Sequence, residues 1–285
     1  MSPEILWEKH TKQRCRGNGN HENKGVLMAS KKTPAQRRED VVDNVEYISR
    51  HQPSVSNALR IKLDHLKTFE PLTENQRLFF DAYKRGDYFV ALHGVAGTGK
   101  TFCALYKALE EVLDKNNPFK KVIIVRSAVQ GREVGHLPGD ISEKMEIYQQ
   151  PYRQICETLF GRKDGWDRLE EQGYVEFIST SFIRGMSWDD AIIIVDECQN
   201  LTWEEIHTCM TRVGYRSKIM WCGDYRQTDI DKKKTDMSGL IKFLDVASLM
   251  KSHTRIEFTV DDIVRSSIVR DWIIATMEYD DRRNL

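Results

Sequence analysis

Short apolar runs alternate with helical patterns along most of this chain, and this alternation constrains its fold more than any other feature. The run at 191–195 is apolar throughout, as expected of a strand buried on both faces. Residues 100–114 instead place their apolar side chains at helical spacing. Strands of this kind separated by helices predict a single α/β domain, with a mostly parallel sheet and helices on both faces. The expected strands are 88–93, 122–125, 174–178, 191–195, 218–222 and 255–258.

The first part of the chain has a different composition. Residues 14–20 are polar and glycine-rich, and residues 31–38 are basic with a proline, so neither segment can bury much surface. We therefore expect residues 1–65 to be a partly disordered N-terminal extension and residues 66–285 to be the folded domain. Met28 is followed by Ala-Ser-Lys-Lys, like an ordinary protein start, so the residues before it are expected to have little structural consequence.

Composition excludes some classes of protein. The formal net charge of the 285 residues is zero, which argues against a histone-like nucleic-acid binder but not against local basic patches. No apolar run approaches the roughly 18–20 residues that span a bilayer, so no membrane association is expected. The six cysteines are scattered without a C-x-x-C pair, which favours buried or free thiols in a reducing cytoplasm over a zinc site or a disulfide framework.

Eight residues between the first expected strand and the next helix follow the pattern G-x-x-x-x-G-K-[ST]. Glycines allow a tight turn whose backbone N–H groups point at phosphate oxygens, and the following helix offers its free N–H groups. In this pattern the lysine reaches the β- and γ-phosphates, and the last hydroxyl binds Mg²⁺. Because the strand and helix are in place, we expect ATP and Mg²⁺ here rather than a chance match. The residues are Gly94, Val95, Ala96, Gly97, Thr98, Gly99, Lys100 and Thr101.

An acidic pair, Asp196 and Glu197, follows the apolar run at 191–195. Open α/β sheets bind ligands beyond the carboxyl ends of their strands. We assign Asp196 to the Mg²⁺ shell and Glu197 to activating the attacking water. Neighbouring side chains of a strand point opposite ways, so both face the site only if the chain turns at this point. The alternative is that the pair simply caps the next helix.

Two glutamines are weaker candidates. Gln227 follows the run at 218–222 and is expected to bond the γ-phosphate or the attacking water; the alternative is an ordinary turn. Gln76 carries an amide that can pair with adenine. Thr73 and Gln76 also have the spacing of a helix capping box, and both roles can hold together.

Taken together, these motifs resemble the PhoH-like family of P-loop ATPases, which is related to the first helicase domain of superfamily 1. The resemblance covers about residues 70 to 277, and its compact size is similar to the phage-encoded members. Cys198 stands where the family usually has alanine, and Met186 where an arginine is common. The stretches that carry the resemblance are 94–101, 125–129, 136–140, 182–185, 195–202, 210–214, 223–227, 238–240 and 262–265.

The resemblance implies a single RecA-like P-loop NTPase domain with helicase-like ATPase activity. It further implies association with RNA or single-stranded DNA and a ring-shaped homo-oligomer, such as a hexamer. The expected location is the cytoplasm, that of the host if the chain is phage-encoded. The expectation of ATP use comes from residues of this chain, whereas the expectation of nucleic-acid use comes from the resemblance, and kinship alone does not transfer function.

One lobe of a helicase motor fits in this chain, whereas the motor needs a second lobe to supply an arginine. An arginine from a neighbouring subunit would fill this role and can contribute about 10³–10⁵ in rate. Each candidate can also be a plain surface or ion-paired residue, and Asp261 and Asp262 are possible partners of Arg265. The candidates are Arg184 and Arg265, and also Arg212 and Arg270.

Two other functions remain open. One is an ATP-dependent switch that binds a protein or RNA partner without translocating. The other, less favoured, is a small-molecule kinase, which would need an acceptor site and a mobile lid that the sequence does not suggest.

Overall fold

A computed structural model describes residues 60–127, 141–224 and 239–283. Its centre is a six-stranded sheet in the order β3-β2-β4-β5-β1-β6, and every neighbouring pair is parallel. All carboxyl ends of the strands therefore lie along one edge. The six predicted strands are confirmed, each to within one residue at either end. They are β1 Phe89–Gly94, β2 Lys121–Arg126, β3 Val175–Ser179, β4 Ala191–Val195, β5 Lys218–Gly223 and β6 Thr254–Phe258.

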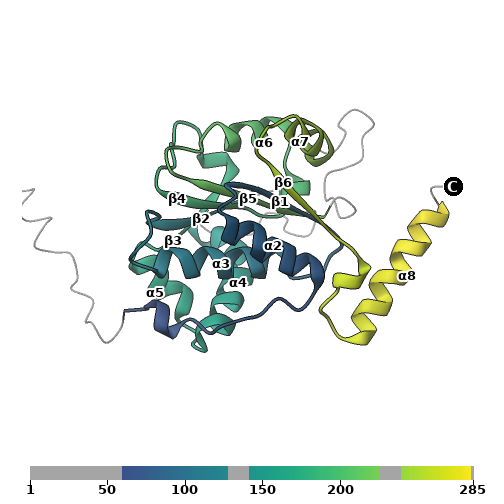
Figure 1. Cartoon of the computed structure of the whole chain (residues 1–285), viewed down its shortest axis with the longest axis horizontal. Coiled ribbons are helices and arrows are strands. Elements are labelled where there is room, and N and C mark those ends of the chain that lie inside the picture. The colour runs from purple at the N-terminus through teal and green to yellow at the C-terminus, as the bar shows by residue number, and fades with distance from the viewer. Residues whose placement is uncertain (1–59, 128–140, 225–238, 284–285) are drawn as a thin grey trace, which may run out of the picture. The chain divides into compact units, whose positions relative to one another are not determined.

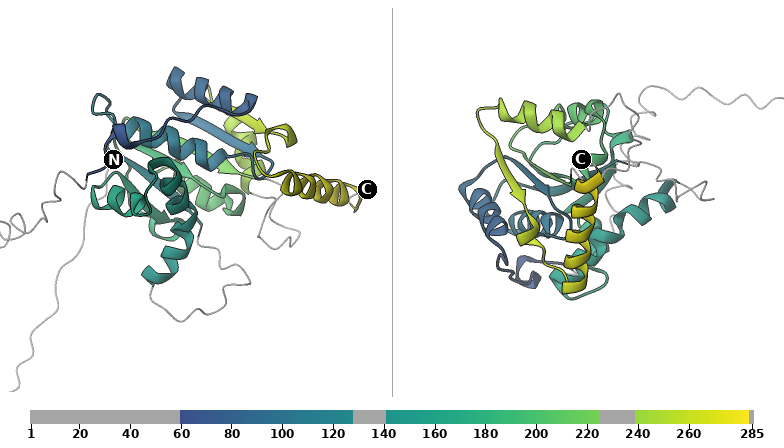
Figure 2. Two further views of the ribbon diagram at one scale, coloured as in Figure 1. Left: turned by 90° about the horizontal axis from the view of Figure 1, so that it is seen from below. Right: turned by 90° about the vertical axis from the view of Figure 1, so that its right-hand side faces the viewer.

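Helices cover both faces of the sheet, as predicted. Helices α2 to α5 lie on one face and α6 and α7 on the other (Figure 1). In the left view of Figure 2 the last helix, α8, extends beyond these layers. The helices are α2 Glu74–Arg85, α3 Lys100–Leu113, α4 Ile141–Phe160, α5 Gly165–Glu171, α6 Trp203–Met210, α7 Gly239–Ser248 and α8 Ser267–Arg283. Short 3₁₀ turns are η2 Leu63–His65, η3 Thr180–Phe182, η4 Cys198–Asn200 and η5 Val260–Asp262.

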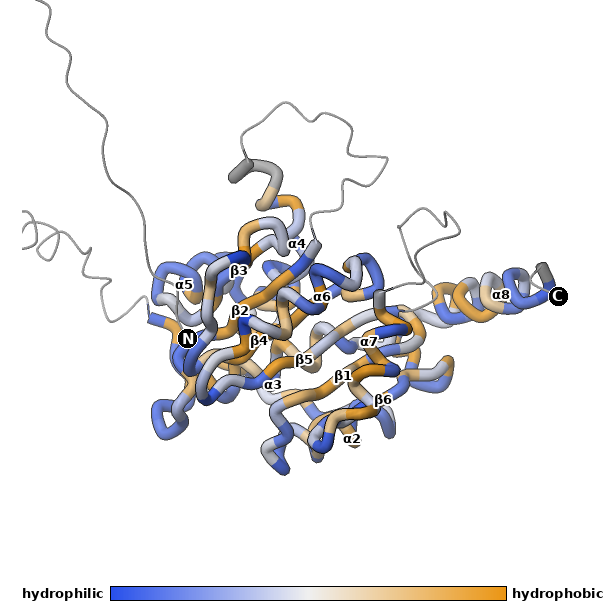
Figure 3. Tube along the Cα trace, turned by 90° about the horizontal axis from the view of Figure 1, so that it is seen from above, coloured by the Kyte–Doolittle hydropathy of each residue, from blue (hydrophilic) through white to orange (hydrophobic). Residues whose placement is uncertain are grey.

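Two apolar cores result from the alternation of side chains along the strands. Ile192 and Ile194 of β4 join the core under α2–α5, whereas Ile193 and Val195 join the core under α6 and α7. The strands accordingly form the most hydrophobic band in Figure 3. Ile61 is also buried in the first core, so packing begins inside the segment predicted to be an extension.

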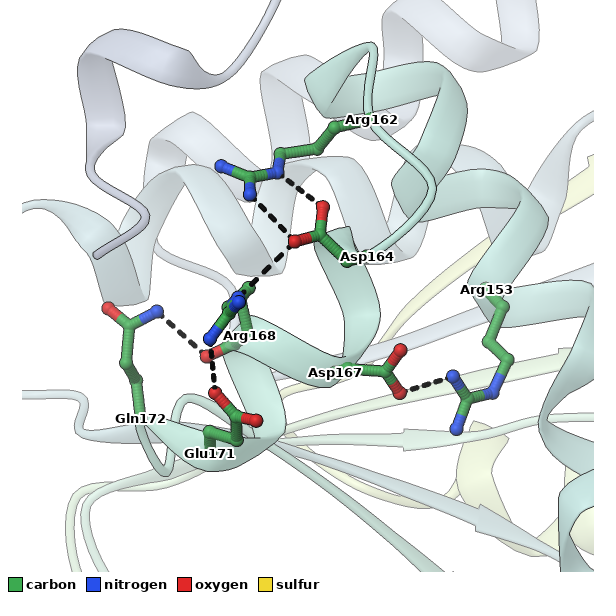
Figure 4. Close-up of polar contacts among 7 residues, drawn as sticks. All are labelled: Arg153, Arg162, Asp164, Asp167, Arg168, Glu171 and Gln172. Carbon is green, nitrogen blue, oxygen red and sulfur yellow. Dashed lines mark hydrogen bonds and ion pairs between the residues drawn. The ribbon is translucent and has the colours of Figure 1, made fainter. Parts of the chain in front are cut away.

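One face of helix α4 packs on the first core, and an ion pair joins α4 to α5. After Pro151, helix α4 buries Tyr152, Cys156 and Leu159 at helical spacing. Arg153 of α4 forms an ion pair with Asp167 of α5 (Figure 4). The same close-up shows a chain of polar contacts that ties the α4–α5 turn to α5, made by Arg162, Asp164, Arg168, Glu171 and Gln172.

The cysteines of the described residues are free and buried, as predicted. Burial raises the pKa of the Cys103, Cys156 and Cys209 thiols to about 12, so these thiols are poor nucleophiles near neutral pH. None of the helices that the structure describes is long and apolar enough to cross a membrane.

Candidate functional site

The predicted P-loop connects β1 to α3 at the carboxyl edge of the sheet. Gly94, Gly97 and Gly99 have φ values of 117°, 74° and 82°, which side chains rarely tolerate. A Cβ on Gly94 would lie 2.1 Å from the carbonyl oxygen of Phe258 on the neighbouring strand. The glycines of the pattern are therefore required by the backbone of this turn, as the sequence predicted.

Lys100 lies folded into this loop. Its Nζ donates to the carbonyl oxygens of Gly94 and Val95 at 3.0 and 2.7 Å, and it lies 3.3 Å from the Thr98 hydroxyl. Burial lowers the pKa of Lys100, and the charge of Asp224 opposes the shift. The loop thus presents a buried ammonium to its interior, where an anion would compete with the carbonyl oxygens for it.

The P-loop meets the acidic pair across the sheet. The Thr101 hydroxyl donates to Oδ1 of Asp196 at 2.7 Å, although β5 separates β1 from β4 in the sheet. Asp196 is 4% exposed. Burial and the charge of Glu197 raise the pKa of Asp196, while hydrogen bonds from Thr101 and Tyr152 lower it. The two residues predicted to hold Mg²⁺ are therefore in contact.

These donors suit Mg²⁺, which prefers hard oxygen ligands. Mg²⁺ is usually held by one or two protein oxygens while nucleotide phosphates and waters complete the shell. The hydroxyl of Thr101 and the carboxylate of Asp196 provide such oxygens beside the loop expected to hold the phosphates. The residues present thus fit the ion that the pattern implies.

Glu197 has a left-handed backbone, with φ 50° and ψ 41°. Such a turn is needed if both acidic side chains are to face the site. The Glu197 carboxylate accepts from Nε2 of Gln199 at 2.6 Å, and Oε1 of Gln199 accepts from the Asp224 N–H at 3.0 Å. The ends of β4 and β5 are thereby joined.

Gln76 contacts the P-loop, and its amide is already partly engaged. Its Oε1 accepts from the Leu72 N–H at 2.8 Å, and its Nε2 donates to the carbonyl of Thr98 at 2.9 Å. The Thr73 hydroxyl caps α2 by accepting from the Gln76 N–H. One half of the predicted capping box is therefore present, whereas the Gln76 side chain bonds Leu72 and not Thr73. These two bonds use one acceptor position and one N–H of the amide, so one of each remains for a base such as adenine.

The two leading arginine candidates lie in different places. Arg265 is beside the P-loop of its own chain, where its Cγ would be 3.0 Å from a Cβ on Gly97. The alternative that Arg265 pairs with its acidic neighbours is not what the structure has, because Asp261 pairs with Arg270 at 3.6 Å and Asp262 bonds Asn75.

Arg184 follows η3, after β3 at the far end of the sheet from the P-loop. At about 4.8 Å per strand, β3 lies roughly 19 Å from β1. The structure therefore does not bring Arg184 to the P-loop of its own chain. Another candidate, Arg212, donates to the carbonyl of Met186 at 3.2 Å. Gln227 and the motif at 136–140 lie outside the described residues.

Tyr152 and Arg126 border the site without having been predicted. The Tyr152 hydroxyl donates to Oδ2 of Asp196 at 2.8 Å. Burial lowers the pKa of Arg126, but the Tyr152 hydroxyl and the Asp196 and Glu197 carboxylates outweigh it, so the net shift is upward. No motif marks Tyr152, since an aromatic residue at helical spacing reads as an ordinary core position.

Comparison with known proteins agrees with this geometry. The sequence profile of the family described as "PhoH-like protein" matches residues 68–278. The chain is 36% identical over 210 residues to the PhoH-like protein of Bacillus subtilis, covering 73% of this chain and 64% of that one. It is 33% identical over 232 residues to the PhoH-like protein of Mycobacterium leprae, covering 80% and 64%. The chain thus spans less than two thirds of the length of these relatives.

A solved structure, the Sulfolobus solfataricus SWI2/SNF2 ATPase core in complex with dsDNA, is similar over 62% of this chain and 37% of that one, at 16% identity and a TM-score of 0.33. A likeness at that level carries no weight. The assignment depends on the match of the family profile to most of the chain and on a P-loop and acidic pair that meet at one edge of a parallel sheet. The chain belongs to the PhoH-like protein family.

Proposed function

We propose that this protein binds ATP with Mg²⁺ and hydrolyses it. The observation that supports this most directly is the contact between Thr101 and Asp196, 2.7 Å apart, next to the buried ammonium of Lys100. A phosphate-binding lysine, a hydroxyl and a carboxylate brought together from separate elements are the parts that P-loop hydrolysis requires.

Each residue has a role in the proposed reaction. Lys100 exchanges its carbonyl partners for the β- and γ-phosphates, and Thr101 and Asp196 hold the ion, which neutralises phosphate charge when bound. Glu197, fixed by Gln199, orients and activates the attacking water. We assign the γ-phosphate sensor to Gln227, as proposed from the sequence.

We also propose that a neighbouring subunit completes the site in a homo-oligomeric ring. Arg184 is exposed and distant from its own P-loop, as an arginine acting in trans should be. Arg265 is the alternative, acting within its own chain. Mass photometry with and without ATP·Mg²⁺ tests the ring. A strict monomer with full activity would rule out the arginine in trans.

The surface around η3 supports action on RNA or single-stranded DNA. Phe182 is 51% exposed and Met186 is 38% exposed, with Arg184 between them. Within the described residues Arg184 has no ion-pair partner. An exposed aromatic ring beside a free cation can stack on a base and contact phosphate without reading sequence. The same features suit a switch that binds RNA without translocating.

Single-stranded RNA should stimulate the ATPase, and the stimulation should weaken as salt rises because phosphate contacts release counterions. Phe182→Ala should reduce stimulation while leaving the basal rate intact. Leu249→Ala, at a residue that is 84% exposed and directly follows α7, is a matched control. RNA binding without stimulated turnover would favour the switch, and strand displacement would be required for a helicase.

The hydrolytic assignment has a direct test. Lys100→Ala should abolish both tight ATP binding and turnover, because the loop loses its cation. Glu197→Gln should retain ATP binding and stop turnover, because only the group that activates water is lost. Undiminished ATP binding by Lys100→Ala, measured by calorimetry, would contradict the phosphate site.

A further inference from the structure

Both oxygens of the Asp196 carboxylate are held by hydroxyl groups that come from different helices. Thr101 of α3 donates to Oδ1 at 2.7 Å, and Tyr152 of α4 donates to Oδ2 at 2.8 Å. Two opposed donors leave the carboxylate plane little freedom to rotate. The orientation of Asp196 is thus fixed by residues outside its own strand.

The tyrosine is itself firmly placed. Tyr152 is 0% exposed, and its ring lies against Trp166 and Phe177, with centroids 6.1 and 5.8 Å away. The ion pair between its neighbour Arg153 and Asp167 joins the same turn of α4 to α5, as Figure 4 shows. A fully buried ring in contact with two other rings has little room to change rotamer, so its hydroxyl is held in place.

The two hydroxyls differ in what they would do when nucleotide binds. The Thr101 oxygen belongs to the P-loop pattern and is assigned to the ion, so its bond to Asp196 competes with that role. Tyr152 lies outside the pattern, and its hydroxyl can hold Oδ2 throughout. This division leaves Oδ1 of Asp196 free to turn toward the cation while Oδ2 stays anchored.

We propose that Tyr152 is a positioning residue that orients Asp196 toward the divalent cation of the nucleotide complex. The proposal rests on the ATP site proposed above. Groups that hydrogen-bond a metal ligand typically change metal affinity or activity roughly 10- to 100-fold when removed. The alternative is that Tyr152 only fills the core and uses Asp196 as an acceptor for a buried hydroxyl. The two differ in whether cation dependence changes.

The test is equilibrium binding of a fluorescent ATP analogue to the full chain, titrated with Mg²⁺, for Tyr152→Phe. Removing one oxygen keeps the ring and its packing. The Mg²⁺ concentration for half-maximal tight binding should rise roughly tenfold or more, while binding without Mg²⁺ stays unchanged. Thermal melting of each variant reports whether the fold is retained.

Tyr106→Phe is a matched control. Tyr106 is 3% exposed, and its hydroxyl accepts from the Phe69 N–H at 3.3 Å and donates to Glu110 at 3.4 Å. The Tyr106→Phe variant therefore loses a comparable buried hydroxyl on α3, and this hydroxyl does not contact Asp196. Its Mg²⁺ dependence should match the wild type within about twofold, since no ligand is touched.

A double-mutant cycle provides a second measurement. In an Asp196→Asn background, adding Tyr152→Phe should change the Mg²⁺ dependence less than about twofold, because the group it orients is gone. A shift in Tyr152→Phe no larger than that of Tyr106→Phe would overturn the positioning role while leaving the ATP site intact. Absence of nucleotide binding by the wild type would overturn the ATP site and the positioning role together.

Discussion

Two acidic pairs flank β4, and they are similar in sequence but opposite in surroundings. Asp189 and Asp190 precede the strand, whereas Asp196 and Glu197 follow it. Asp190 is 6% exposed and forms ion pairs with Lys120 and Arg216, both at 2.6 Å. Those partners lower the pKa of Asp190. Asp196 is equally buried, yet in the part of the chain that the structure describes it forms no ion pair, and its pKa is raised by burial and Glu197.

Backbone strain does not distinguish the two ends. Asp190 has a φ of 52° and Glu197 a φ of 50°, so each pair contains one left-handed residue. The difference is charge compensation. The Asp190 carboxylate is neutralised by two ion pairs. The Asp196 carboxylate is hydrogen-bonded to two hydroxyls and is attracted by the charges of Arg126 and Lys100, but among the described residues it forms no ion pair, so it keeps an attraction for a cation supplied from outside. The difference in charge compensation therefore identifies the carboxyl end of β4 as the end where a cation is expected to bind.

The largest expected effect is on turnover. Asp196→Asn should lower ATP hydrolysis by roughly 100-fold or more, because charge stabilisation by a bound ion contributes several kcal/mol. Asp190→Asn makes the same chemical change at the other end of β4 and should leave turnover within about twofold, as expected for a distant, independent site. Phosphate release at saturating ATP measures both. Equal losses in the two variants would remove the functional distinction between the ends.

Much of the site at the carboxyl end of β4 was predicted from the sequence, but not all of it. Apolar runs fixed the strands to within one residue, and the P-loop pattern and the acidic pair predicted that Thr101 and Asp196 share a site. Strand order depends on long-range packing, so the insertion of β5 between β1 and β4 was not predicted. The same limit explains why Tyr152 was missed, since its role depends on which helix lies over the end of β4.

The local sequence pattern also could not show which side chains already form hydrogen bonds within the chain. The amide of Gln76 was assigned to adenine, but in the structure it bonds Leu72 and Thr98. The placement of Arg265 beside Gly97 depends on how the segment after β6 returns to the P-loop, where the Val264 N–H donates to the Gly97 carbonyl at 3.1 Å. Such contacts join residues far apart in the chain, and neither periodicity nor spacing encodes them.

A smaller effect, of opposite sign at the two ends, is expected in stability. Asp196→Asn should raise the melting temperature by about 2–4 °C, because it removes a buried negative charge that Glu197 repels. The hydroxyls of Thr101 and Tyr152 can form hydrogen bonds with the new amide instead. Asp190→Asn should lower it by a few degrees, because Lys120 and Arg216 lose their partner while asparagine still tolerates the left-handed backbone. Differential scanning calorimetry without nucleotide checks both signs. A decrease in both variants would mean that Asp196 is a structural anchor like Asp190.

The smallest effect concerns pH and depends on His93, at the carboxyl end of β1. Its Nε2 accepts from Nε of Arg255 at 2.7 Å. Burial, together with the charges of Arg255 and Lys100, lowers the pKa of His93 from 6.5 to about 4. Below pH 6.5 the unfolded chain binds a proton that the folded chain refuses, so stability falls as the pH drops from 6.5 toward 4. Asp190 differs, because its lowered pKa removes stability only as the pH falls through the acid range of carboxylates.

The two contributions can be separated with His93→Gln, whose amide oxygen can still accept from Arg255 but cannot titrate. Denaturant unfolding at pH 7 and at pH 4.5 gives the free energy of unfolding of each protein. The wild type should lose roughly 2 kcal/mol more than the variant between these pH values, after allowance for partial solvent screening. Carboxylates common to both proteins cancel in this difference. If both proteins lose the same free energy of unfolding between these pH values, His93 gains a proton as readily in the folded chain as in the unfolded one. The nearby cations Arg255 and Lys100 would then not keep it neutral.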